Sequence, residues 1–306
     1  METEFIHWLR GRLPAHPQLL LGPGDDAAVL RLTRADGCVV TSDLLNDGVD
    51  FLLDQCDPRL VGRKALAVNL SDLAAMAARP VAAVVSLLLP RAGALPLAQQ
   101  LFEGLLPLAE EFHVAVAGGD TNTWDGRLVI CVTAIGEVTG DRPLRRNGAL
   151  PGDELLVTGR LGGSLLGKHL HFTPRVREAL TLHARYRLHA ATDISDGLTL
   201  DLSNILTESG CGAVLDLEQI PLDGAAQRLA AQDAPGGSAL DHALGDGEDF
   251  ELILAAGPDE ARRMLDDQPL ETPLTRIGAC TAEPGLWVRD AAGGPLRRME
   301  PRGWRH

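Results

Sequence analysis

The sequence predicts an α/β protein built from two domains, on the strength of three observations. Its 306 residues, 45% of them hydrophobic, can bury a sizeable core and suit two domains better than one. Apolar runs of strand length alternate with longer segments of helical periodicity along the chain. Residues 145–152, which are rich in Arg, Gly and Pro, indicate a linker. We therefore expect domains at 1–148 and 149–306.

The first half is expected to mix strands and helices. Asp57 and Pro58 predict the start of a long helix, because Asp caps a helix N-terminus and Pro is tolerated at the first helical position. Asn69 and Asp72 are three residues apart in that helix and so share one face. The helices expected here span 4–13, 58–78 and 97–113, with turns over 14–24, and the strands span 27–32, 37–43, 81–90, 114–120 and 127–138.

The second half is expected to continue the alternation of strands and helices. Its loop DISDG, residues 193–197, precedes a helix that Asp201 and Asn204 are expected to serve. The expected strands span 153–159, 212–217 and 249–256, the helices 163–171, 174–190, 197–209 and 222–232, with a turn at 233–238 and a short helix and strands up to the C-terminus.

Acidic residues beside small ones are the most informative local feature of the sequence. They lie in or beside apolar runs, where an unpaired carboxylate is costly to desolvate. Magnesium takes a few carboxylates together with substrate phosphates, so the clusters favour a shared metal site and phosphoryl transfer. Helix capping and turn chemistry, or a structural calcium site, are the alternatives. The clusters are Gly24-Asp25-Asp26, Ser42-Asp43, Asn69-Leu70-Ser71-Asp72, Gly118-Gly119-Asp120 and Asp193-Ile194-Ser195-Asp196-Gly197.

Composition excludes several classes of protein. The formal charge of -14 leaves no basic surface for nucleic acid or an anionic membrane. Four Trp, six Phe and one Tyr are too few for a base-stacking platform. The five cysteines form no CxxC pair and are expected to be reduced thiols. No stretch resembles a signal peptide or a membrane span, so we expect a cytoplasmic protein.

The segment GGSLLGKH, residues 162–169, nearly matches a phosphate-binding P-loop. His169 stands where such a loop has the hydroxyl residue that coordinates magnesium. A glycine-rich turn between a strand and a helix is therefore the favoured interpretation. His171 and His183 lack regular ligand spacing, and we expect all three histidines to be structural or exposed.

Two further sets of charged residues each have two possible interpretations. The segment GDGED, residues 245–249, is either a turn with a solvated acidic face or a substrate contact. Arg145 and Arg146 either clamp a phosphate or are ordinary surface charge beside a linker.

In this order, the motifs resemble those of the thiamine-monophosphate kinase family, which belongs to the PurM-like ATP-binding superfamily. The resemblance spans nearly the whole chain. The segments that carry it are GDDAAVL at 24–30, TSD at 41–43, KALAVNLSDLAAMAARP at 64–80, AGGDT at 117–121, PGDELLVTG at 151–159, DISDGL at 193–198 and GEDFEL at 247–252.

This resemblance implies a PurM-like homodimer in which the N-terminal mixed-sheet domains pair, with a C-terminal α/β domain beside each. ATP and several Mg²⁺ ions would lie in the cleft between domains, with thiamine monophosphate as the second substrate. The positions that match metal ligands are Asp26, Thr41, Ser42, Asp43, Asp72, Asp120, Asp193 and Asp196. Those that match nucleotide contacts are Gly119, Asp120, Arg146 and Ser195, and Glu248 matches a substrate contact.

Two departures from the family pattern concern the substrate side. Asp50 replaces a histidine that the family uses towards the substrate. The C-terminal motif has Pro301 and Trp304 at its aromatic positions, and Trp304 can still stack on a cationic ring.

The expected reaction is direct in-line transfer from ATP to the substrate phosphate, without a side-chain nucleophile or a phosphoenzyme. The alternatives are a PurM-like enzyme that acts on another phosphorylated small molecule, or a nucleotide-binding protein without turnover.

Overall fold

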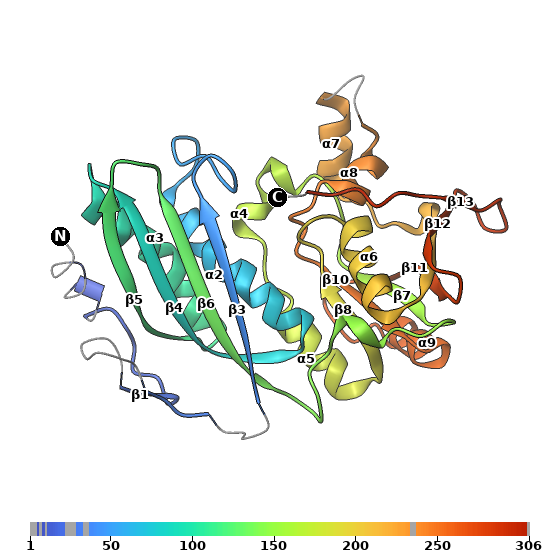
Figure 1. The fold of residues 1–306 in the computed structure, drawn as a ribbon, viewed down its shortest axis with the longest axis horizontal. Coiled ribbons are helices and arrows are strands. Elements are labelled where there is room, and N and C mark those ends of the chain that lie inside the picture. Colours follow the sequence, from blue (N-terminus) through green and yellow to red (C-terminus); the bar gives the residue numbers. More distant parts are fainter. Residues whose placement is uncertain are drawn as a thin grey trace. The chain divides into compact units, whose positions relative to one another are not determined.

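A computed structural model describes Phe5, Trp8, Leu9 and residues 11–21, 29–32, 37–232 and 237–304. The chain forms two compact units (Figure 1). The first consists of Met1–Leu73 and Ala78–Thr139, and the second of Ala74–Ala77 and Gly140–His306. Asp26, one of the expected metal ligands, lies outside the described residues.

The first unit contains a four-stranded mixed sheet. Its strand order is β3-β6-β4-β5, with β4 and β5 parallel and the other neighbours antiparallel. A separate antiparallel pair joins β1 and β2. The strands are β1 (Leu19–Leu21), β2 (Val29–Leu30), β3 (Cys38–Asn46), β4 (Ala78–Pro90), β5 (Ala115–Trp124) and β6 (Val129–Val138).

Two long helices, α2 (Pro58–Ala75) and α3 (Ala94–Glu111), cover one face of this sheet. Among the described residues, Figure 1 shows no helix on the other face, which we call the uncovered face because no helix lies on it. The helices approach closely at two glycines. A Cβ atom on Gly62 would lie 1.8 Å from the Leu101 carbonyl oxygen, and one on Gly104 would lie 1.8 Å from that of Arg59. Any larger residue there would force the helices apart.

The second unit contains a seven-stranded sheet in the order β13-β12-β9-β11-β7-β10-β8. Its neighbours are antiparallel except β9 and β12. The strands are β7 (Glu154–Thr158), β8 (Leu188–Asp193), β9 (Gly212–Asp216), β10 (Leu252–Ala256), β11 (Leu274–Thr281), β12 (Gly285–Arg289) and β13 (Arg297–Arg298).

Helix α6 packs its apolar side onto this sheet and forms the core of the unit. Leu198, Leu202 and Ile205 of α6 are fully buried in one cluster with strand residues such as Val157 and Ile253. The helices of the unit are α4 (Lys168–His171), α5 (Val176–Arg185), α6 (Leu198–Ser209), α7 (Gly224–Gln232), α8 (Ala239–Gly245) and α9 (Pro258–Asp267). The short 3-10 turns are η1 (Arg146–Gly148), η2 (Ser164–Leu166) and η3 (Leu217–Gln219).

The prediction of one helix over 174–190 is wrong. Helix α5 ends at Arg185, and residues 188–193 form β8, which pairs with β10. The segment LHAATD contains good helix formers, but its ladder with β10 and the burial of Leu188 and Ala190 override that local preference.

Other boundaries also differ from the predictions. The helix expected over 163–171 is divided into η2 and α4 at Gly167, whose φ is 117°. Helix α8 was not expected, although Ser238 and Asp241 form a capping box that marks its start. Strands β3 and β5 continue past Asp43 and Asp120, so both acids lie inside strands.

Candidate functional site

The first group of candidate residues lies where β3 faces α2. Thr41 and Asp43 are two residues apart on β3 and therefore point to the same side of the sheet. Asp72 is on α2, and its carboxylate accepts a hydrogen bond from the Thr41 hydroxyl. We call Thr41, Asp43, Asp50 and Asp72 the acidic group.

Negative charge is concentrated in this group. Burial, together with the nearby charges of Asp72 and Asp50, raises the pKa of Asp43 to about 7. The Oδ2 atom of Asp43 is buried and accepts no hydrogen bond from the described residues. The buried Oδ1 atom of Asn69, one turn before Asp72 on α2, is in the same condition. Such oxygens suit a hard divalent cation, which takes oxygen ligands and offsets the repulsion.

Asp50 has a local role in the fold. Its carboxylate accepts a hydrogen bond of 2.7 Å from the Asn46 N–H and so closes the turn after β3. The carbonyl oxygen of Asp50 accepts a bond of 2.8 Å from Nζ of Lys64, which is completely buried on α2. Sequence reasoning missed Lys64, although a lysine inside the apolar run KALAV was a signal that could have found it.

The structure places Ser42 and Asp120 on the other face of the sheet. Asp43 shares a cross-strand row with Val132, Val85 and Gly119, and that row faces the helices. Asp120 lies in the next row, and Ser42 precedes Asp43, so both side chains point to the uncovered face. Within one chain, the structure therefore does not bring Asp120 or Ser42 together with Asp43 and Asp72.

Gly119 has a steric reason to be glycine. A Cβ atom at this position would lie 1.7 Å from the Val85 carbonyl oxygen on the neighbouring strand. The preceding Gly118 has open space around it. The register shifts between Ala83 and Val84, opposite this part of β5.

The second group of candidate residues is the last residue of β8 together with the loop that leads to α6, residues 193–197. Its N–H groups at Ser195, Asp196 and Gly197 each donate a hydrogen bond of 3.0 Å to one oxygen of Asp201. The Asp201 side chain therefore satisfies the backbone N–H groups just before α6. This confirms the prediction that Asp201 serves this helix. These three donors are already used, so a phosphate cannot bind to them in this conformation.

Two other segments are bonded directly to this loop. The Glu248 N–H donates to the Ser195 carbonyl at 2.7 Å, and the Trp304 N–H donates to the Asp196 carbonyl at 2.9 Å. Trp304 is 57% exposed, so its ring is accessible. Two of the residues expected to contact the substrate, Glu248 and Trp304, thus share one backbone framework with Asp193 and Asp196.

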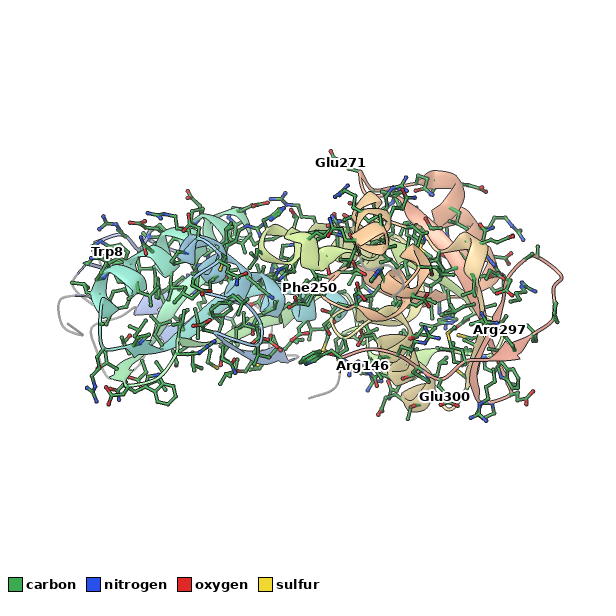
Figure 2. All side chains as sticks on the ribbon, turned by 90° about the horizontal axis from the view of Figure 1, so that it is seen from above. Trp8, Arg146, Phe250, Glu271, Arg297 and Glu300 are labelled. Atoms are coloured by element: carbon green, nitrogen blue, oxygen red, sulfur yellow. The ribbon has the colours of Figure 1, made fainter. Side chains whose placement is uncertain are left out.

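Arg146 lies beside the strand that leads into this loop. Its Nε donates a hydrogen bond of 3.2 Å to the Thr192 hydroxyl, next to Asp193 (Arg146 is labelled in Figure 2). The Arg146 carbonyl accepts from Ser209 on α6 at 2.7 Å. These contacts hold the guanidinium beside the end of β8.

The glycine-rich segment 162–169 is not a phosphate-binding loop. Lys168 donates to the Arg160 carbonyl at 3.2 Å and lies 3.4 Å from a Glu251 oxygen. The Gly162 N–H donates to the carboxylate of Asp249 at 2.9 Å. A strand-to-helix turn, the favoured interpretation, is confirmed.

The described part of the chain lacks two kinds of feature. Among these residues, no three His, Cys, Asp or Glu side chains form a group that could hold a metal ion by themselves. None of the helices there combines the length and the apolar character needed to cross a membrane.

Comparison with known proteins places this chain in a family. Residues 24–138 match the model of the AIR synthase related protein N-terminal domain, and residues 153–290 match that of the C-terminal domain. A thiamine-monophosphate kinase of Rhodopirellula baltica is 42% identical over 313 residues, which cover 100% of this chain and 97% of that protein. The chain belongs to the thiamine-monophosphate kinase family.

Solved structures agree with this assignment. The crystal structure of thiamine-monophosphate kinase from Stenotrophomonas maltophilia is 36% identical, with a TM-score of 0.79, over 95% of this chain and 96% of that one. A structure described as AaThiL complexed with AMPPCP and TMP is 25% identical, with a TM-score of 0.76, over 100% of this chain and 95% of that one. The two-domain α/β architecture that the resemblance implied is confirmed.

Proposed function

We propose that this protein transfers the γ-phosphoryl group of ATP to thiamine monophosphate, giving thiamine diphosphate and ADP. The observation that carries the proposal is the direct bonding of Glu248 and Trp304 to the loop 193–197. This bonding fixes an acid and an accessible aromatic ring, which suit a cationic substrate, beside the acids of the loop. The identity of 42% over the whole chain to a thiamine-monophosphate kinase supports the same substrate.

Mg²⁺, when bound, would neutralise the phosphates and favour transfer of the γ-phosphoryl group. The acidic group fits it, because Asp43 and Asp72 supply carboxylates and one buried oxygen of Asp43 receives no hydrogen bond from the residues that the structure describes. We assign Asp193 and Asp196 of the second unit as further ligands. Asp26, Ser42 and Asp120 complete the proposed set.

The remaining chemistry depends on positioning. A phosphate oxygen of thiamine monophosphate attacks the γ-phosphorus, and the bond to the β-phosphate oxygen breaks, with its electron pair leaving on ADP. The acceptor phosphate is already ionised at neutral pH, so no side chain has to remove a proton. Arg146 and Ser195 are assigned to the nucleotide, and Glu248 and Trp304 to the thiamine rings.

We also propose that the protein is a homodimer formed through the uncovered face of the four-stranded sheet. Val40 and Leu44 of β3 are 58% and 59% exposed there, which is costly for an apolar sheet face in water. Ser42 and Asp120 lie on this face, so a second copy could bring them to a shared site. The described cysteines are all free thiols, which fits a location in the reducing cytoplasm.

A comparison of acceptors tests the proposed substrate. Wild-type protein is incubated with ATP, Mg²⁺ and either thiamine monophosphate or other small phosphomonoesters, and ADP formation is measured for each. We expect thiamine monophosphate to give the highest kcat/KM. Preference for another acceptor, with Asp50→His restoring activity on thiamine monophosphate, would instead assign this chain to a branch with a different substrate.

A further inference from the structure

The segment 162–172 contacts every residue of the turn 247–251, which carries Glu248. Ser164 Oγ donates to the Gly247 carbonyl at 2.7 Å, and Nδ1 of His169 lies 3.1 Å from Oε2 of Glu248. The other contacts are Gly162 N–H to Asp249, the stacked rings of Phe172 and Phe250 with centroids 4.0 Å apart, and Lys168 to Glu251 (Phe250 is labelled in Figure 2).

The turn needs this support because its backbone is strained. Glu248 and Phe250 have φ values of 54° and 51°, in the left-handed region that side chains other than glycine rarely adopt. Between them, Asp249 is almost completely buried. Such conformations persist where surrounding contacts enforce them, and they occur often at functional sites.

His169 is the contact that reaches the side chain of Glu248. The Glu248 side chain is 24% exposed, so a ligand can reach it, whereas the His169 side chain is 14% exposed. An imidazole N–H that donates to one carboxylate oxygen restricts the rotation of that carboxylate and leaves the negative charge in place when the ring is neutral.

We propose that His169 is a positioning residue that holds the Glu248 carboxylate in the orientation in which it binds the cationic ring of the substrate. This inference rests on the proposed function. It assigns a role in substrate specificity to a histidine in the segment that resembles a P-loop. The same residue takes no part in the phosphoryl transfer itself.

Steady-state kinetics with thiamine monophosphate tests the inference. For His169→Ala we expect the KM for thiamine monophosphate to rise roughly 5- to 10-fold, as for the loss of a hydrogen bond to a charged group. The kcat and the KM for ATP should stay unchanged. His169→Asn should restore a low KM, because its amide nitrogen takes the place of Nδ1. His171→Ala, an exposed change on the same helix, is the control.

A double-mutant cycle separates positioning from a general packing effect. In a Glu248→Gln background, His169→Ala should raise the KM by much less than it does in the wild type, because the charged partner is gone. An equal rise in both backgrounds, or no rise in the wild type, overturns the inference. Wild-type protein that makes no thiamine diphosphate refutes the proposed function and this inference together, whereas wild-type turnover with an unchanged KM in His169→Ala refutes the inference alone.

Discussion

Three buried carboxyl groups, Asp43, Asp201 and Asp249, have a pKa raised to about 7, in each case chiefly by burial. Their surroundings differ. Asp201 and Asp249 accept backbone N–H groups that partly offset the cost of burial. One oxygen of Asp43 has no such donor among the described residues. This difference separates two acids that hold the fold from one that is suited to a cation.

Replacing Asp72 by Asn should remove metal binding and keep the fold. Asn can still accept the hydrogen bond from Thr41, but it lacks the charge that a divalent cation needs. We expect kcat to fall about 100-fold or more. The stabilisation by Mg²⁺ with ATP in a thermal-shift experiment should disappear. Asp125→Asn, a change at an exposed acid paired with Arg91, is the control. A full Mg²⁺ effect in Asp72→Asn would contradict the assignment of this acid.

Asp249 should make the protein less stable as the pH rises. Between pH about 4 and 7 the folded protein keeps a proton on Asp249 that the unfolded chain has lost, so the free energy of unfolding falls with pH across this window. Asp249→Asn removes this titration and keeps an acceptor for Gly162. Its melting temperature should exceed that of the wild type by several degrees at pH 8, and this advantage should shrink or vanish at pH 4.

The matched control for this titration is Asp259→Asn, an acid at the exposed start of α9. The difference in melting temperature between Asp259→Asn and the wild type should stay nearly constant from pH 4 to pH 8. If the melting temperatures of the wild type and Asp249→Asn differ by the same amount at every pH from 4 to 8, Asp249 ionises normally in the folded protein.

Among the elements, strand β5 offers a test of close packing. Gly119→Ala places a Cβ atom 1.7 Å from the Val85 carbonyl, so β4 and β5 must separate. We expect a loss of stability of about 2 kcal/mol or more, measured by chemical denaturation, in the range typical of strained or overpacked sites. Gly118→Ala adds the same atom in open space and should cost clearly less. Equal effects of the two changes would show that the close approach does not matter.

Most elements could be predicted from hydrophobic periodicity and caps, as Asp57 and Pro58 at the start of α2 show. Strand β8 could not, because only its ladder with β10 distinguishes LHAATD from the end of a helix. The strand predicted to start at residue 249 in fact starts at Leu252, because the residues before it form a turn that is set by contacts with a distant segment. Glu248 and Phe250 adopt left-handed conformations that depend on contacts with a distant segment.

For the whole molecule, the sequence predicts a set of candidate acids but not which face of the sheet each one occupies. The spacing of Ser42 and Asp43 was visible, yet their opposite orientations depend on the register of β3 with β6. Asp120 lies on the edge strand β5, and β3 is the strand at the opposite edge of the same sheet. The face and the strand on which each acid lies are set by this long-range strand pairing, which the sequence does not show.

The uncovered sheet face leads to a prediction about assembly. Val40→Glu together with Leu44→Glu should convert a dimer into a monomer in light scattering after gel filtration, because the charges would be buried at the proposed interface. Leu296→Glu, at an exposed leucine of the second unit, should leave the dimer intact. A wild-type protein that is monomeric at micromolar concentration would contradict the proposed dimer.

The most direct test of the proposed function is the stoichiometry of the products. Wild-type protein is incubated with ATP, Mg²⁺ and thiamine monophosphate, and ADP and thiamine diphosphate are quantified together by chromatography. Direct transfer predicts one thiamine diphosphate for each ADP, and no product after removal of Mg²⁺ with a chelator. Formation of ADP without thiamine diphosphate, or no reaction with all three components present, would contradict the account.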